Sequence, residues 1–383
     1  MLIKNGKIYT MAGKVYEKGD ILIEDGKIKE IKEEIKGNYE EVIDAKGATI
    51  IPGMIDAHCH LGLFEGGKGF EGSDGNEMTD PITPHVRAID GIYPMDDYFN
   101  KAIEAGVTTV MTGPGSANVI GGQFLAMKTY GKSVDSMALL EVGAMKIAFG
   151  ENPKRVYNGK GKMPMTRMAT AALLRQTLIE AKNYKAKKEA AEKKEEAFDI
   201  NIKMEALLPV LDKKIPLKAH CHRADDILTA IRIAKEFDVN LTLDHCTEGH
   251  LIPEYVKESK APAIVGPTMS FNSKIEVNNK SFETPAVLMR EGVKVAIMTD
   301  HPVIEIQYLP VCAGLAAKNG NLTFEEALST ITINAAEILG LSHRVGSLEV
   351  GKDADLVIID GNPFDLYRNT LYTIIDGKVV YKG

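Results

Sequence analysis

Two histidines, His58 and His60, stand one residue apart at the end of a short apolar run over residues 54–59. In a β-strand, residues i and i+2 point to the same side, so both imidazoles would project from one strand end onto one face. Imidazole nitrogens at this spacing can share a divalent metal ion. A His-x-His pair can equally be a packed structural pair, so the other histidines must decide between the two interpretations.

Three more strand-like runs end in residues that could bind a metal. His220 and His222 follow 215–219, His245 follows 240–244, and Asp300 with His301 follows 293–299. The first of these pairs precedes an amphipathic helix, predicted over 224–237 from its apolar face and its acidic first turn. Strand, ligand-type residue and helix in repeated order are typical of a (β/α)8 barrel, whose chemistry lies at the carboxyl ends of the strands. The predicted strands are 54–59, 107–112, 123–128, 144–149, 216–221, 241–246, 262–266 and 294–299.

The two ends of the chain have a different character from its middle. Residues 1–52 and 345–383 read as short strands separated by the turn-forming pairs Asn5-Gly6, Asp25-Gly26 and Asp376-Gly377. We therefore expect an α/β protein with one small β-sandwich domain built from 1–52 plus 345–383, flanking a parallel barrel at 53–344. Residues 61–95 are too long for an ordinary loop and predict a lid or rim of the active site. Residues 166–212 predict a long helical region.

Composition narrows the classes of function. The chain has 383 residues, 44% of them hydrophobic, and a formal charge of −7, which gives no basic face for nucleic acid. No apolar run approaches the roughly 18 residues that span a membrane, and the start lacks a signal-peptide core. The four cysteines, next to the candidate ligands in three cases, are interpreted as packing residues on the opposite strand face. We expect a cytoplasmic protein with a small-molecule substrate, without nucleic acid or membrane partners; a homo-oligomer stays open.

The chain resembles the amidohydrolase superfamily of metal-dependent hydrolases, and within it the imidazolonepropionase-related branch. The passage Pro52-Gly53-Met54-Ile55-Asp56-Ala57-His58-Cys59-His60 carries the resemblance most clearly. The opening segments 3–8 and 21–28 and the closing segments 334–340 and 346–357 extend it over essentially the whole length.

The resemblance implies a set of metal ligands: His58 and His60 on strand one, His220 on strand five, His245 on strand six and Asp300 on strand eight. Many members also carry a carbamylated lysine on strand four, for which Lys146 is the candidate; Glu141 is the alternative, as a bridging carboxylate. A CO2-derived carbamate on Lys146 would give two metal ions, and its absence would leave one. Zinc is the first expectation, with iron, manganese or nickel as alternatives for imidazole and carboxylate ligands.

The same resemblance implies hydrolysis of an amide or cyclic amide C–N bond of a small molecule through a metal-activated hydroxide. Asp300 would be the catalytic residue that accepts and returns the proton, although an aspartate there could also be a helix N-cap. His222 and Arg155 are the expected substrate contacts, and Arg155 could bind a carboxylate bidentately.

Three alternatives stay open. A metallodipeptidase or N-acyl amino acid hydrolase would use Arg155 for its substrate carboxylate. Deamination of a heterocycle is put in doubt because the glutamate that follows the strand-five histidine in related enzymes is not obvious, and His222 stands near its place. A non-catalytic scaffold relative would have lost its ligands, whereas every transferred position is intact here.

Overall fold

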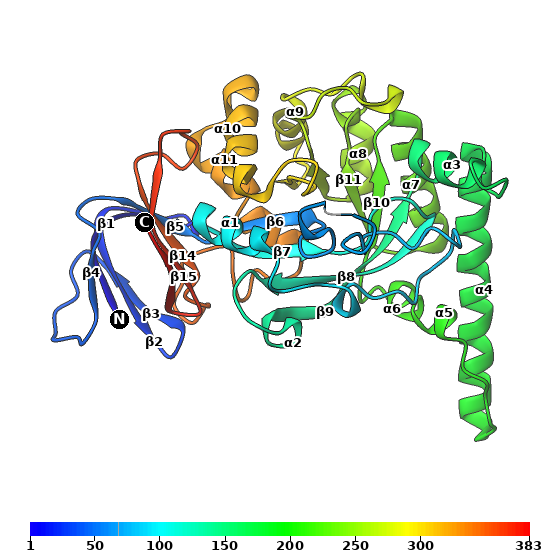
Figure 1. Cartoon of the computed structure of the whole chain (residues 1–383), viewed down its shortest axis with the longest axis horizontal. Helices are drawn as coiled ribbons and strands as arrows, with labels where there is room; N and C mark the ends of the chain where they lie inside the picture. Colours follow the sequence, from blue (N-terminus) through cyan, green and yellow to red (C-terminus); the bar gives the residue numbers. More distant parts are fainter. Residues whose placement is uncertain (68) are drawn as a thin grey trace.

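Two β-sheets organise the protein, and the computed structural model describes residues 1–67 and 69–383. One sheet combines strands from both ends of the chain, and the other contains strands from its middle (Figure 1). The helices surround the second sheet. This confirms the fold expected from the sequence, a barrel surrounded by helices with an additional β-structure from the termini.

The terminal sheet has the strand order β16-β15-β14-β5-β1-β2-β3, with β4 paired to β1. Its strands are β1 (Leu2–Tyr9), β2 (Val15–Glu24), β3 (Lys27–Lys32), β4 (Val42–Asp44), β5 (Thr49–Pro52), β14 (Leu356–Asp360), β15 (Asn369–Ile375) and β16 (Lys378–Lys382). Asp25-Gly26 and Asp376-Gly377 form the predicted hairpin turns, with positive φ at all four residues. Asn5-Gly6 does not form a turn. It lies inside β1, where Asn5 has φ 59° and the pairing with β2 shifts register, so the pair makes a bulge.

The barrel sheet has the order β13-β12-β11-β10-β9-β8-β7-β6. Its strands are β6 (Met54–Cys59), β7 (Val107–Thr112), β8 (Ile120–Lys128), β9 (Ala138–Ala148), β10 (Leu217–Cys221), β11 (Leu241–His245), β12 (Ala263–Val265) and β13 (Val295–Ile297). The ring closes after β13, where Asp300 N–H donates to His58 O (3.3 Å) and His60 N–H donates to His301 O (2.9 Å). The metal-ligand candidates of the first and last strands thereby meet.

One strand corrects the expectation of a wholly parallel barrel. β8 pairs antiparallel with both β7 and β9, while the other neighbouring strands of this sheet run parallel. Only residues 113–119 connect β7 to β8, and this stretch contains no helix. A parallel partner needs a crossover of a dozen or more residues, so the short connection reverses the strand.

The helices lie around the barrel, and the predicted helix 224–237 is confirmed as α7 (Ala224–Phe237). The others are α1 (Asp97–Ala105), α2 (Val134–Met137), α3 (Glu151–Asn158), α4 (Arg167–Lys194), α5 (Ile202–Glu205), α6 (Leu208–Leu211), α8 (Pro253–Ser259), α9 (Thr284–Arg290), α10 (Leu309–Gly320), α11 (Phe324–Thr330) and α12 (Ile333–Ile338). The charged end of α4 extends beyond the body of the protein, where solvent can reach its charged side chains (Figure 1).

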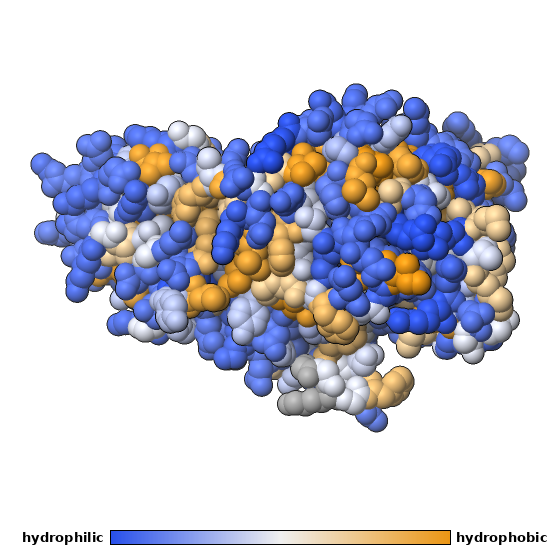
Figure 2. Space-filling model, turned by 90° about the horizontal axis from the view of Figure 1, so that it is seen from above, coloured by the Kyte–Doolittle hydropathy of each residue, from blue (hydrophilic) through white to orange (hydrophobic). Residues whose placement is uncertain are grey.

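The two sheets share apolar packing, since Val357 and Ile359 of β14 belong to the same buried cluster as Val107 of β7 and Ala102 of α1. The face seen in Figure 2 is mostly hydrophilic and interrupted by several separate apolar patches. Among the described residues, no helix combines the length and apolar character needed to cross a membrane. All four cysteines are buried and free, as expected for packing residues.

Candidate metal centre

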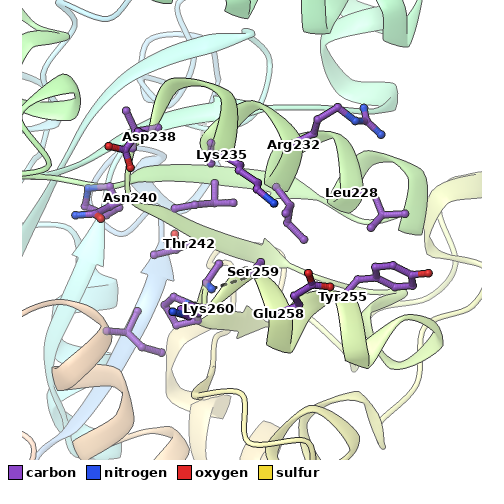
Figure 3. Close-up of a pocket in the computed structure, with 18 residues that line it drawn as sticks. Leu228, Arg232, Lys235, Asp238, Asn240, Thr242, Tyr255, Glu258, Ser259 and Lys260 are labelled. Carbon is purple, nitrogen blue, oxygen red and sulfur yellow. Dashed lines mark hydrogen bonds between the residues drawn. The ribbon is translucent and has the colours of Figure 1, made fainter.

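The sequence-predicted residues gather around one pocket at the carboxyl ends of the barrel strands. This pocket has a volume of about 350 Å³, and its lining includes His60, His220, His222, His245 and Asp300. A larger hollow of about 950 Å³ lies at the opposite ends of β10, β11 and β12, where α7 and α8 pass (Figure 3). Its lining holds no histidine or cysteine, so the chemistry belongs to the smaller pocket.

His58, His60 and Asp300 form the first group of donors. Asp300 Oδ1 lies 3.3 Å from His60 Nε2 and 3.6 Å from His58 Nε2. One ligand atom from each of the three side chains falls within 4.8 Å of the other two. Such a set of two imidazoles and a carboxylate suits a divalent metal. Asp300 has φ 55°, a left-handed conformation that is uncommon outside glycine and is typical of functional positions.

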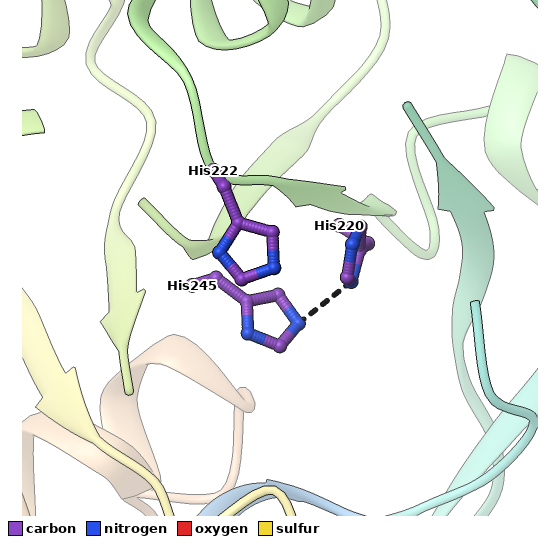
Figure 4. Close-up of side chains that lie close together, drawn as sticks. All are labelled: His220, His222 and His245. Carbon is purple, nitrogen blue, oxygen red and sulfur yellow. Dashed lines mark hydrogen bonds between the residues drawn. The ribbon is translucent and has the colours of Figure 1, made fainter. Parts of the chain in front are cut away.

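His220, His222 and His245 form a second group with the same spacing (Figure 4). His220 Nδ1 lies 2.8 Å from His245 Nε2. His222, expected at the substrate, lines the pocket and also belongs to this group of possible ligands. Its Nδ1 is 2.7 Å from Thr247 Oγ1, which leaves Nε2 as the atom available to a ligand.

Lys146 lies beside the first group of donors. Its Nζ is 3.1 Å from His58 Nε2, and the residue is fully buried. Burial lowers the pKa of Lys146 to about 8, and the charge of Lys218 acts in the same direction. Glu141, the alternative, has a side chain that is 70% exposed and pairs with Arg87, so it does not reach the site.

Burial holds the pKa of His58, His220, His222 and His245 well below the usual value. These imidazoles are therefore neutral, which is the form that binds metals. Three candidate ligands have a hydrogen-bond acceptor on the nitrogen that faces away from the pocket: Gly113 O is 2.6 Å from His60 Nδ1, Gly266 O is 2.9 Å from His245 Nδ1, and Asp244 Oδ2 contacts His58 Nδ1. Such acceptors fix the tautomer of a metal-binding histidine.

Asp56 and His301 lie behind the candidate ligands. Asp56 accepts hydrogen bonds from the Thr299 hydroxyl (2.5 Å) and from His58 N–H (3.2 Å), and burial raises its pKa to about 7. His301 packs against Tyr98 with ring centroids 4.5 Å apart. Burial lowers the pKa of His301 to about 3, so this ring is a neutral packing group.

Sequence reasoning missed Asp244, Lys218 and Glu276. Lys218 Nζ lies 2.9 Å from Asp244 Oδ2, and both residues are buried. Strand alternation places Asp244 on the face opposite His245. Both reach the site because His245, the last residue of β11, has φ 69° and departs from the extended conformation. Glu276 lies in the connection between β12 and α9, and its position depends on how that connection folds.

These donors fit a divalent metal, and the comparisons with known proteins agree. Residues 49–380 match the profile of the Amidohydrolase family. The chain belongs to the amidohydrolase family. A crystal structure of an amidohydrolase from Thermotoga maritima MSB8 is 44% identical, covers 100% of both chains and superposes with a TM-score of 0.97.

Two relatives of this amidohydrolase match it over different shares of their own length. An imidazolonepropionase of Thermoplasma volcanium is 25% identical over 419 residues, covering 98% of this chain and 96% of the relative. The amidohydrolase tasK of Hapsidospora irregularis is 28% identical over 394 residues, covering 95% of this chain but only 40% of the relative. The first match accords with the branch that the sequence resembles. The protein is thus a hydrolase acting on carbon–nitrogen bonds.

Proposed function

We propose that the protein is a divalent-metal-dependent hydrolase of an amide or cyclic amide C–N bond in a small molecule. The observation that carries this proposal is the pair of buried donor groups around one pocket, each with three ligand atoms within 4.8 Å. His58, His60 and Asp300 would hold one ion, and His220 with His245 would hold the other. Zinc fits these donors; iron, manganese and nickel are the alternatives.

Lys146 would connect the two ions as a carbamate. The neutral amine attacks CO2, an N–C bond forms and one proton leaves, which gives an anionic group with two oxygen ligands. A pKa lowered to about 8 makes the neutral amine accessible near neutral pH. The position of Nζ, 3.1 Å from His58 Nε2, supports a carbamate next to the first donor group.

Asp300 is the proposed catalytic residue. Bound divalent ions would polarise the substrate carbonyl and make water more acidic. Asp300 lines the pocket, so its carboxylate can take a proton from the attacking water and pass it to the leaving nitrogen. Burial would raise the pKa of Asp300, but the neighbouring His245, His60 and Lys146 hold it below the usual value, so the residue starts as a base.

The pocket wall supports a polar substrate. His222 and Arg155 line the pocket, together with Lys274 of the connection between β12 and α9. Lys274 pairs with Glu276, so Arg155 is the cation on this wall that favours a substrate with a carboxylate. It keeps a metallodipeptidase or N-acyl amino acid hydrolase as the second candidate. A non-catalytic scaffold is disfavoured because both donor groups are complete. The cytoplasmic location and a homo-oligomeric state stay predictions.

The test is hydrolysis by the purified enzyme before and after chelation, with acyl amino acids, dipeptides and cyclic amides as substrates. We expect at least one class to be hydrolysed, and chelator to abolish the reaction reversibly. His58→Ala and Asp300→Asn should each lower kcat/KM by about a thousandfold or more without changing the far-UV circular dichroism. His343→Ala, on an exposed residue, is the matched control. Full activity in His58→Ala or Asp300→Asn would refute the proposal.

A further inference from the structure

The orientation of His220 differs from that of the other candidate ligands. His58, His60 and His245 each place Nδ1 against an acceptor outside the pocket, so their Nε2 atoms face inward. His220 is reversed, because its Nδ1 lies 2.8 Å from His245 Nε2. The nitrogen of His220 that needs an outside acceptor is therefore Nε2.

Glu276 supplies a carboxylate at that position. Its Oε1 lies 3.8 Å from His220 Nε2 and 3.8 Å from His222 Nε2. Glu276 and His220 are 1% and 3% exposed, and His220 Nε2 is buried without a hydrogen-bond partner, whereas Glu276 Oε1 has Lys274 Nζ at 2.7 Å. Unpaired buried polar atoms are rare and costly. The separation is about 1 Å longer than a hydrogen bond, so a small rotation of the His220 side chain pairs them.

The surroundings of Glu276 hold the carboxylate in place. Its Oε2 accepts a hydrogen bond from Glu151 N–H (2.8 Å), and Glu276 N–H donates to Glu151 Oε1 (3.2 Å). Lys274 Nζ lies 2.7 Å from Glu276 Oε1, and a terminal guanidinium nitrogen of Arg167 lies 3.9 Å from Glu276 Oε2. These contacts fix the orientation of the buried Glu276 carboxylate, and the neighbouring cations balance its charge.

We propose that Glu276 is a positioning residue that orients the metal ligand His220 through its Nε2–H. The hydrogen bond fixes the tautomer in which the Nδ1 lone pair faces the pocket. Because Glu276 belongs to the connection 266–283, the same contact joins one wall of the pocket to the metal centre. The inference rests on the proposed metal site but not on any particular substrate.

Metal affinity and histidine tautomer test this role independently of activity. The affinity of the full-length protein for Co2+ or Zn2+ is measured by competition with a chromophoric chelator. We expect Glu276→Ala to weaken binding at the second site by 10- to 100-fold, and Glu276→Gln, which keeps an oxygen acceptor, to weaken it less. Glu248→Gln is the matched control, since Glu248 accepts from Asn279 of the same connection but is not paired with His220.

Nitrogen-15 NMR of histidine in the zinc-loaded wild type gives a second readout that needs no variant. We expect His220 to have a protonated Nε2 and a metal-bound Nδ1. Protonation at Nδ1, or metal affinity in Glu276→Ala equal to that of the Glu248→Gln control, would overturn the inference. Absence of hydrolysis on every substrate, with these metal-binding results as expected, would count against the proposed reaction and leave the role of Glu276 standing.

Discussion

At the scale of single residues, the site combines neutral imidazoles with charges that compensate one another. Lys218 and Asp244 pair at 2.9 Å inside the barrel, so the carboxylate that holds His58 is itself neutralised. Lys146 of β9 lies opposite Lys218 of β10 in the strand pairing, and Lys218 has Asp244 as its close partner. Two buried lysines in one environment thus divide their roles, because Lys218 pairs with Asp244, while Lys146, whose pKa burial lowers to about 8, is the one available as an amine.

Lys146→Met gives a prediction about metal content. Without the bridging carbamate, we expect the bound metal to fall from two ions per chain to one, because the second group of donors loses a shared anionic ligand. Inductively coupled plasma mass spectrometry measures the content, and carbon-13 NMR in labelled bicarbonate shows the carbamate signal in the wild type alone. Lys160→Met, at an exposed position, is the control. Two tightly bound ions in Lys146→Met would rule out the bridge.

At the scale of elements, strand positions were predictable and strand direction was not. The apolar run at 123–128 marks β8, but only the length of its connections sets its antiparallel direction. The ligand positions converge because each lies in or just after the carboxyl end of a strand of the same barrel: His58, His60, His220, His245 and Asp300. Glu276 follows no such periodic signal, and Asp244 departs from the alternation rule just before His245 and Cys246, which both have positive φ. Sequence patterns therefore predict elements better than the contacts between loops.

Gly122 of β8 provides a prediction about the element next to the site. It has φ 131°, and a Cβ atom there would lie 2.4 Å from Val86 O, the acceptor for Gln123 N–H. We expect Gly122→Ala to lower the free energy of unfolding by about 2–4 kcal/mol through backbone strain and this clash. Urea unfolding checks the value. Gly47→Ala, with positive φ but open space around it, should cost only about 1–2 kcal/mol; equal losses would contradict the steric argument.

At the scale of the whole molecule, ion pairs join the barrel to the terminal sheet. Lys128, at the end of β8, is 3% exposed and lies 3.0 Å from Asp353, 2.5 Å from Asp355 and 3.1 Å from Asp376. Arg368 and Thr373 also donate hydrogen bonds to the carbonyls of Ala105 and Ile103. Together with the shared apolar cluster, these contacts make the terminal sheet a support for the barrel, so we expect both parts to unfold together.

Asp353 makes that coupling sensitive to acid. Burial would raise its pKa, but Lys27, Lys128 and Arg344 lower it to about 2 from the ordinary 3.8. A carboxyl with a lowered pKa in the folded state stabilises the protein above pH ~4, and this contribution, about 2 kcal/mol, is lost as the pH falls from ~4 to ~2. Asp353→Asn should therefore lower the free energy of unfolding at pH 7 by at least about 2 kcal/mol and flatten its dependence on pH in that window.

Urea unfolding between pH 2 and pH 7 measures both effects, with Asp360→Asn at an exposed position as the control. If the wild type and Asp353→Asn lost stability in parallel over this range, Asp353 would not link the two sheets electrostatically.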